Sequence, residues 1–226
     1  MRSFDETMWS PPGSRPHIEI PASGQVHALA EVYLAQTRTW WAEQDDSRPF
    51  EAVFRPVAPE FRHLTVAWLD QLTADITAEH LDDLHTALGA RLRHIAPFDV
   101  TVGPAIMGLY ALELYVAPHP QADAVAAAAR AAIREVFGAQ AAPEPPPARP
   151  WRPHITACYG RQRADTDALA SRIAYTFAPD TEHLITPATM PVDAVLLVDQ
   201  NTWGPTGLAW DTDTARRIPL GHPQPG

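Results

Sequence analysis

The chain has 226 residues, of which 46% are hydrophobic and 19% are charged, proportions typical of a folded globular protein rather than a disordered one. Its 17 basic and 27 acidic side chains give a formal net charge of −10, which disfavours binding of long nucleic acid by general electrostatic attraction. All of the basic residues are arginines. The absence of lysine excludes a lysyl-nucleotide ligase, a Schiff-base enzyme and a P-loop, since each depends on a lysine amine.

The single cysteine, Cys158, excludes an internal disulfide and a cysteine-based zinc site. The first residues lack the apolar core of a secretory signal, and no run approaches the roughly eighteen apolar residues of a membrane span. We therefore expect a soluble cytoplasmic protein with no membrane partner.

The first 24 residues are rich in Pro, Ser and Gly without a sustained period, which predicts a tail or strap. From residue 25 onward, the spacing of the apolar residues predicts regular helices and strands. In chain order these are a helix over 25–44, a buried strand over 62–70, a helix capped by Thr77 and ending near His94, strands near 98–102 and 110–116, and an alanine-rich helix over about 121–137.

The segment 141–150, AAPEPPPARP, separates two similar halves of the chain. Proline removes backbone donors and fixes φ, so this segment predicts a stiff connector. The elements expected after it are a strand over 154–159, a helix over about 166–177, a strand over 192–199 and a strand pair near 208–220. The repeated strand–helix–strand–strand order indicates one bilobal domain over 25–221, with lobes at about 50–140 and about 151–221.

Each lobe opens with the same short phrase, HLTV at 63–66 and HITA at 154–157. Because side chains alternate along a strand, the histidine and threonine of each phrase share one face, while the two apolar residues point to the other. Chance alone gives two such phrases in a chain of this composition with a probability of about 0.01. The pattern predicts two strands anchored in a core, each offering an imidazole and a hydroxyl on its opposite face.

The phrases resemble the paired His-x-[Ser/Thr]-apolar motifs of the two-histidine (2H) phosphoesterase superfamily, in its RNA 2′,5′-ligase-like and cyclic phosphodiesterase branch. RHLTVAWL resembles the first motif, RPWRPHITACYG the second, and VDAVLLVDQ … RIPLG the family's final strands. The likeness covers roughly residues 50–221. It implies an α+β fold with two pseudo-symmetric lobes, whose antiparallel sheets flank a central cleft.

The resemblance assigns catalysis to His63, His154, Thr65 and Thr156. Opening a 2′,3′-cyclic phosphodiester needs a base to deprotonate water and an acid to protonate the leaving ribose oxygen, and two imidazoles can do both without a metal or cofactor. The threonine hydroxyls can stabilise the charge that develops on the phosphate oxygens. Which histidine is the acid stays open.

Substrate-binding residues are less clearly marked, because relatives often carry a basic residue five positions after the second histidine, where this chain has Tyr159. Tyr159 either hydrogen-bonds the substrate or buries its ring. Arg152 and Arg161, with two further arginines nearby, either supply the missing positive charge or form a solvated rim. Trp151 either stacks on a base or packs internally.

Two other residues attract attention. Cys158 has even spacing from His154 and is expected to share its face, although a lone cysteine in a strand is usually a small hydrophobe. His17 in RPHIEI mimics the motif, but Glu19 replaces the threonine and the phrase lies in the predicted tail.

The leading hypothesis is a metal-independent phosphodiesterase that opens 2′,3′-cyclic phosphates, its partner being a small nucleotide or an RNA end with a cyclic phosphate. RNA 2′,5′-ligation by the same histidines is an alternative. A catalytically silent nucleotide- or RNA-binding module is another.

Overall fold

The computed structural model describes residues 1–4, 12–44, 47–142, 151–175, 185–204 and 207–221. Its strands are β1 (Arg15–Pro21), β2 (Phe54–Pro56), β3 (His63–Trp68), β4 (Phe98–Met107), β5 (Ala111–Val116), β6 (His154–Gly160), β7 (Ala188–Val192), β8 (Ala194–Gly204), β9 (Gly207–Ala209) and β10 (Arg216–Pro219). Its helices are α1 (Gln25–Ala42), α2 (Phe50–Val53), α3 (Ala78–Leu92), α4 (Pro120–Phe137) and α5 (Asp167–Tyr175), with short 3-10 turns at Pro59–Phe61 and Thr73–Asp75.

Most of the helices and strands predicted from periodicity are confirmed. Thr77 caps α3 as expected, because its hydroxyl accepts a hydrogen bond from the backbone N–H of His80 at 3.2 Å. The strand predicted over 192–199 instead begins at the end of β7 and ends inside β8, with Asp193 between them. Pro191 lies just before this junction, but the apolar pattern continues beyond Asp193 in Ala194 and Val195, so the pattern does not show where one strand ends. Residues 143–150 of the predicted connector and 176–177 of the last predicted helix lie outside the described residues.

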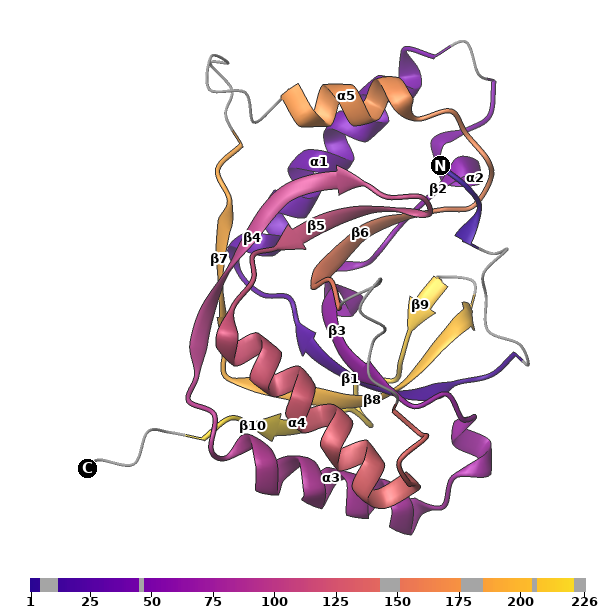
Figure 1. Ribbon diagram of the computed structural model, residues 1–226. Coiled ribbons are helices and arrows are strands. Elements are labelled where there is room, and N and C mark those ends of the chain that lie inside the picture. Colours follow the sequence, from indigo (N-terminus) through magenta and orange to yellow (C-terminus); the bar gives the residue numbers. More distant parts are fainter. Residues whose placement is uncertain (5–11, 45–46, 143–150, 176–184, 205–206, 222–226) are drawn as a thin grey trace.

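The paired strands are all antiparallel and form one curled sheet in the order β10-β8-β1-β3-β6-β5-β4-β7 (Figure 1). Strand β2 adds to β6, and β9 adds to β8. Strands β3 and β6 are in register only at Leu64 and Ile155, so a narrow seam joins two four-stranded halves. The α+β class and the antiparallel strands are confirmed, with the two expected sheets joined as one.

The helices cover the outer face of the curl in two pairs (Figure 1). Helices α3 and α4 pack on each other, with α4 against β3 and α3 against β10. Helices α1 and α5 lie against the other half of the sheet, with α5 on β4 and α1 on β4, β6 and β7. Apolar side chains between helices and sheet form the core, which leaves the opposite face of β1, β3, β5 and β6 for polar residues.

The predicted tail over residues 1–24 is wrong for Arg15–Pro21, which form the inner strand β1 between β3 and β8. Two of the prolines that suggested a tail, Pro16 and Pro21, belong to this strand, and the others and the glycines flank it. Strand β1 is buried along almost its whole length. The expected lobes, 50–140 and 151–221, also do not coincide with the two halves of the sheet. Strand β3 pairs with β1 from the predicted tail, and β6 pairs with β5 from the first lobe, because neighbours in the sheet are not neighbours in sequence.

Within the described ranges, no helix is long and apolar enough to cross a membrane.

Candidate active site

The two His-x-Thr strands are paired with their neighbours in the same way. In the first half, Thr65 of β3 lies opposite Glu19 of β1, and in the second half Thr156 of β6 lies opposite Glu113 of β5. Side chains directly opposite each other on antiparallel strands share a face. Each threonine therefore has a carboxylic side chain as its cross-strand neighbour, and the seam between β3 and β6 brings both pairs to one inner face of the sheet.

A β-bulge follows the threonine of β6. Thr156 is opposite Glu113 but Cys158 is opposite Leu112, so Ala157 is an extra residue in the strand. The bulge reverses the side-chain alternation, and Cys158 turns into the hydrophobic core at 1% exposure. The prediction that Cys158 shares the face of His154 is therefore wrong. Burial also raises the pKa of its thiol to about 12, so the thiol stays protonated at neutral pH.

Strand β3 carries the same bulge at the equivalent place. Val66 is the extra residue between Thr65 and Ala67, and both Val66 and Ala67 are buried. Trp68, the next residue, is half exposed. Tyr159, which follows the bulge of β6, is partly exposed. The two halves are thus alike in the His-x-Thr phrase, in the cross-strand pairing of its threonine and in the bulge that follows it.

His63 is held by its backbone-facing nitrogen. Nδ1 lies 2.7 Å from the carbonyl oxygen of Phe61, so Nδ1 donates its proton there and Nε2 remains for chemistry. The ring of Trp210 packs edge-on against the imidazole, with centroids 5.3 Å apart. Burial lowers the pKa of His63 to about 4, against the raising effect of the Phe61 carbonyl. The charge of His154 lowers it further. The two histidines lie close together because Leu64 and Ile155, the residues directly after them, pair at the seam between β3 and β6.

His154 has the same tether but a more open position. Its Nδ1 lies 2.8 Å from the carbonyl oxygen of Arg152, again two residues earlier, so Nε2 is again the free nitrogen. The side chain is only partly buried, whereas His63 is 8% exposed. The structure therefore brings together two imidazoles of matching orientation and unequal access to water.

Tyr159 joins the second motif. Its side chain lies near that of Thr156, and the ring of Phe4 lies 4.3 Å from its own. Burial raises the pKa of the Tyr159 phenol, and the charges of Glu113 and Glu19 raise it further. Tyr159 thus lies near Thr156 and near both carboxylic side chains.

Of the other predicted binding residues, Trp151 and Arg152 lie near the motifs and Arg161 does not. The Trp151 indole donates to the Thr65 carbonyl oxygen at 3.2 Å, so this residue does lie beside the first motif, with its ring packed on the core. The Arg152 guanidinium is exposed and 4.0 Å from Glu113. Arg161 follows the far end of β6, about 20 Å along the strand from the histidine, and donates to the Glu51 carbonyl at 3.2 Å. Arg161 is therefore not brought to the histidines.

Sequence reasoning noticed but set aside two residues of β1, which the structure brings to the site. His17 is 3% exposed, and burial lowers its pKa to about 3, against the raising effect of the Arg15 carbonyl; the charge of His63 lowers it further. Glu19 is fully buried, and burial raises its pKa well above the usual range. The signal was present in the alternation of IEIP at 18–21, which matches LELY at 112–115 in the second half. Trp210, which packs on His63, had no such signal because it comes from far along the chain.

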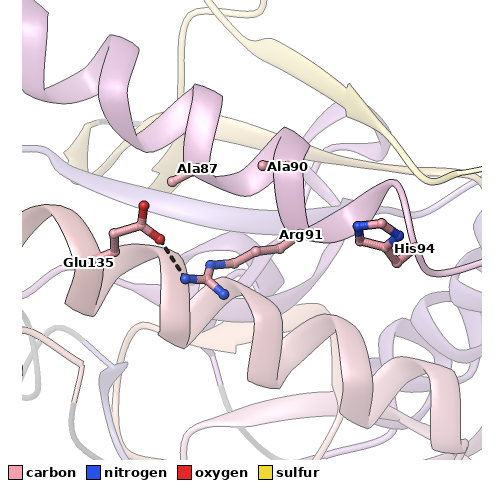
Figure 2. A pocket seen from close by; sticks show the side chains of 5 residues that line it. All are labelled: Ala87, Ala90, Arg91, His94 and Glu135. Carbon is pink, nitrogen blue, oxygen red and sulfur yellow. Dashed lines mark hydrogen bonds and ion pairs between the residues drawn. The ribbon is translucent and has the colours of Figure 1, made fainter.

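A separate hollow of about 450 Å³ lies between α3 and α4, on the outer side of the sheet (Figure 2). Arg91 of α3 reaches across it to Glu135 of α4 at 2.5 Å, so its guanidinium is already paired. His94 lies at the other end of the hollow. In the described part of the chain, no three His, Cys, Asp or Glu side chains are grouped so as to hold a metal ion.

Comparisons with known proteins agree with this architecture. A family model described as the 2′-5′ RNA ligase superfamily matches residues 62–202, which include both motifs. No curated protein sequence matches the chain. The solved TT0787 protein of Thermus thermophilus is 22% identical, with 93% of this chain and 100% of that chain covered and a TM-score of 0.61.

Two structures of LigT from E. coli are also similar. The complex with 3′-AMP is 21% identical, with 92% of this chain and 99% of LigT covered and a TM-score of 0.56. The complex with NADP+ is 20% identical, with 93% and 99% covered and a TM-score of 0.55. At these identities the structures establish the fold, and they confirm the predicted one.

Proposed function

Because the chain belongs to the 2′-5′ RNA ligase superfamily, we propose that it is a metal-independent phosphodiesterase that opens 2′,3′-cyclic phosphates of RNA ends or small nucleotides. Family membership supports an enzyme of the phosphodiesterase or ligase type. The observation that carries the finer proposal is the pair of imidazoles, each tethered through Nδ1 to the carbonyl two residues before it and each followed by a threonine on the same face.

This arrangement suits acid–base opening of a cyclic phosphodiester. One Nε2 takes a proton from water as the water oxygen attacks phosphorus, and the other Nε2 gives a proton to the ribose oxygen as its bond to phosphorus breaks. Hydroxyls of Thr65 and Thr156 stabilise the charge on the non-bridging oxygens. In this proposal Tyr159, whose side chain lies near Thr156, orients that hydroxyl or contacts the phosphate itself.

Small nucleotides fit this proposal as substrates. LigT has been solved with 3′-AMP, and a nucleoside 3′-phosphate is the kind of product that forms when the 2′ oxygen leaves a cyclic phosphate. The net charge of −10 and the absence of lysine weigh against a large RNA held by general electrostatics. Ligation by the same histidines remains the rival activity, since the family takes its name from it.

The test is incubation of the purified chain with 2′,3′-cyclic AMP in excess EDTA, followed by ³¹P NMR. We expect one nucleoside monophosphate isomer to accumulate, and H63A and H154A to abolish it. Activity lost in EDTA and restored by a divalent ion contradicts metal independence. Joining of RNA halves without cyclic-phosphate hydrolysis favours the ligase, and binding of 3′-AMP without either reaction favours a silent module.

A further inference from the structure

Trp210 contacts both partners of the hydrogen bond that tethers the His63 imidazole. In this tether, Nδ1 of His63 lies 2.7 Å from the carbonyl oxygen of Phe61. The indole of Trp210 packs edge-on against the ring of Phe61, with centroids 5.0 Å apart, and against the imidazole of His63, with centroids 5.3 Å apart. Both separations and both steep angles are those of favourable aromatic pairs. One side chain therefore braces the imidazole and the residue that anchors it.

The accepting carbonyl of the tether is fixed by the backbone around it. Phe61 ends the 3-10 turn Pro59–Phe61, and its N–H donates to the Ala58 carbonyl at 2.9 Å. Arg62, the next residue, is 2% exposed, and its guanidinium donates to the Val57 carbonyl at 3.0 Å. The turn thus sets the position of the accepting oxygen, and side-chain packing has to set the orientation of the donating ring.

Trp210 is itself held on both sides. It follows β9, in which Ala209 pairs with Asn201 of β8. The turn after it is closed by Thr214, whose N–H and hydroxyl donate to the Asp211 carbonyl at 3.2 and 3.1 Å. The Trp210 side chain is 7% exposed. A closely packed ring between a strand and a closed turn has little freedom to move, so it restricts the imidazole that it contacts.

The tether of His154 is built differently. The carbonyl that accepts from its Nδ1 belongs to Arg152, whose guanidinium is exposed and lies 4.0 Å from Glu113. The His154 side chain is also only partly buried. A change at Trp210 should therefore alter the first imidazole and leave the second unchanged, which makes His154 an internal control.

We propose that Trp210 is a positioning residue of the active site, which holds the His63 imidazole in one orientation with Nε2 directed at the substrate phosphate. This role rests on the proposed function, in which Nε2 of His63 transfers a proton. Trp210 acts on the reaction through the imidazole and not through a contact with the substrate.

A His63 imidazole without this contact can lose its alignment in two ways. The ring can rotate about its side-chain torsions, and in its neutral form the proton can move from Nδ1 to Nε2. Rotation displaces Nε2, and the second change removes its lone pair, so both impair proton transfer. Trp210 opposes both changes because it keeps Nδ1 within hydrogen-bond length of the Phe61 carbonyl. His63 is 8% exposed, so water has little access to compete for the Nδ1 proton.

The first test determines the tautomer of His63 in the absence of substrate. Long-range ¹⁵N–¹H NMR spectra of the imidazoles distinguish a proton on Nδ1 from one on Nε2, and at about pH 8 an ordinary imidazole is neutral. The full-length wild type is compared with W210L, W210F and the matched control W40L. Trp40 is 5% exposed and lies on α1, on the outer face of the sheet, so W40L removes an equally buried indole elsewhere.

In the wild type and in W40L we expect His63 to carry its proton on Nδ1 alone. In W210L we expect a mixture of both tautomers, and W210F, which keeps an aromatic ring, should restore the Nδ1 form. The signals of His154 should be the same in all four proteins. A folded W210L whose His63 keeps the Nδ1 proton alone overturns the proposal, as does an equal change in W40L.

A kinetic arm on 2′,3′-cyclic AMP measures the consequence for turnover. We expect W210L to lower kcat by about tenfold to a hundredfold with KM within about twofold, the scale of a displaced catalytic group. W210F should recover most of that loss, and W40L should retain the wild-type kcat. A raised KM with an unchanged kcat in W210L indicates a substrate contact and contradicts the proposal. Failure of the wild type to turn over the cyclic phosphate counts against the proposed function alone, since the NMR arm needs no turnover.

Discussion

The two halves of the site have the same backbone arrangement but differ in how far their side chains are exposed to solvent. Strands β3 and β6 have the same phrase, the same cross-strand carboxylic residue and the same bulge after the threonine. Yet His63 and Glu19 are buried, while His154 is partly open and Glu113 lies beside an arginine. Duplicated geometry with divergent environments is how two like groups acquire opposite proton-transfer roles.

The difference extends to the aromatic residues after each bulge. Trp68 is 51% exposed and stacks on the ring of His17, whereas Tyr159 packs against the ring of Phe4 and lies near Thr156. In the first half the buried side chains are therefore His63 and Glu19, whereas in the second half the buried side chain is Thr156. Substitutions at equivalent positions should accordingly have unequal effects.

The largest effect is expected from removing either imidazole. H63A and H154A should each lower kcat by about two to four decades, the usual scale of general acid–base catalysis. The double variant should lose far less than the product of the two losses, because groups that act as a unit are not additive. Steady-state kinetics on 2′,3′-cyclic AMP measures all three, and near-normal turnover by either single variant removes that histidine from the mechanism.

Removing the threonine hydroxyls should have a smaller effect on kcat. T65V and T156V should lower kcat by about a hundredfold, the scale of losing one donor to a developing oxyanion, while both limbs of the pH profile stay nearly in place. T156V should lose more than T65V, since it also removes the hydroxyl beside Tyr159. A displaced limb in either variant shows instead that the threonine acts by changing the titration of a histidine.

The smallest effect concerns stability and isolates the buried carboxyl. The pKa of Glu19 is raised in the folded chain, so its contribution to folding stability is present below its unfolded value of 4.5 and is lost as pH rises through the folded value. E19Q removes this loss. The stability of E19Q relative to wild type should therefore grow with pH above about 5, by at most about 1.4 kcal/mol per pH unit.

Chemical denaturation of wild type, E19Q and E113Q at several pH values measures this difference. E113Q should show no comparable growth, because Glu113 is partly exposed and lies near Arg152. A flat difference for E19Q means that Glu19 is ionised in the folded chain.

Sequence patterns predicted the two motif strands and the main helices, because period and composition are local signals, while the resemblance to a known family implied the α+β fold. They missed β1, since a short strand between prolines and glycines looks like a tail until its pairing with β3 and β8 is known. Alternation alone also misplaced Cys158, because a bulge is a property of two paired strands rather than of one.

The same limit applies to the chemistry. The phrases identified both histidines and both threonines as candidates. Glu19, the buried acid beside His63, lies on another strand and has no such phrase. Burial of Glu19 and contact of Trp210 with His63 depend on tertiary packing between distant segments. Arg161 was predicted at the site from its closeness in sequence, and the length of β6 carries it away.

The central claim, that two imidazoles act as one acid–base pair, is tested most directly by the pH dependence of kcat/KM for the wild type on 2′,3′-cyclic AMP. One group must be neutral and one protonated, so we predict a bell-shaped profile whose limbs belong to the coupled pair. A profile that rises monotonically through neutral pH indicates a single base and contradicts the account.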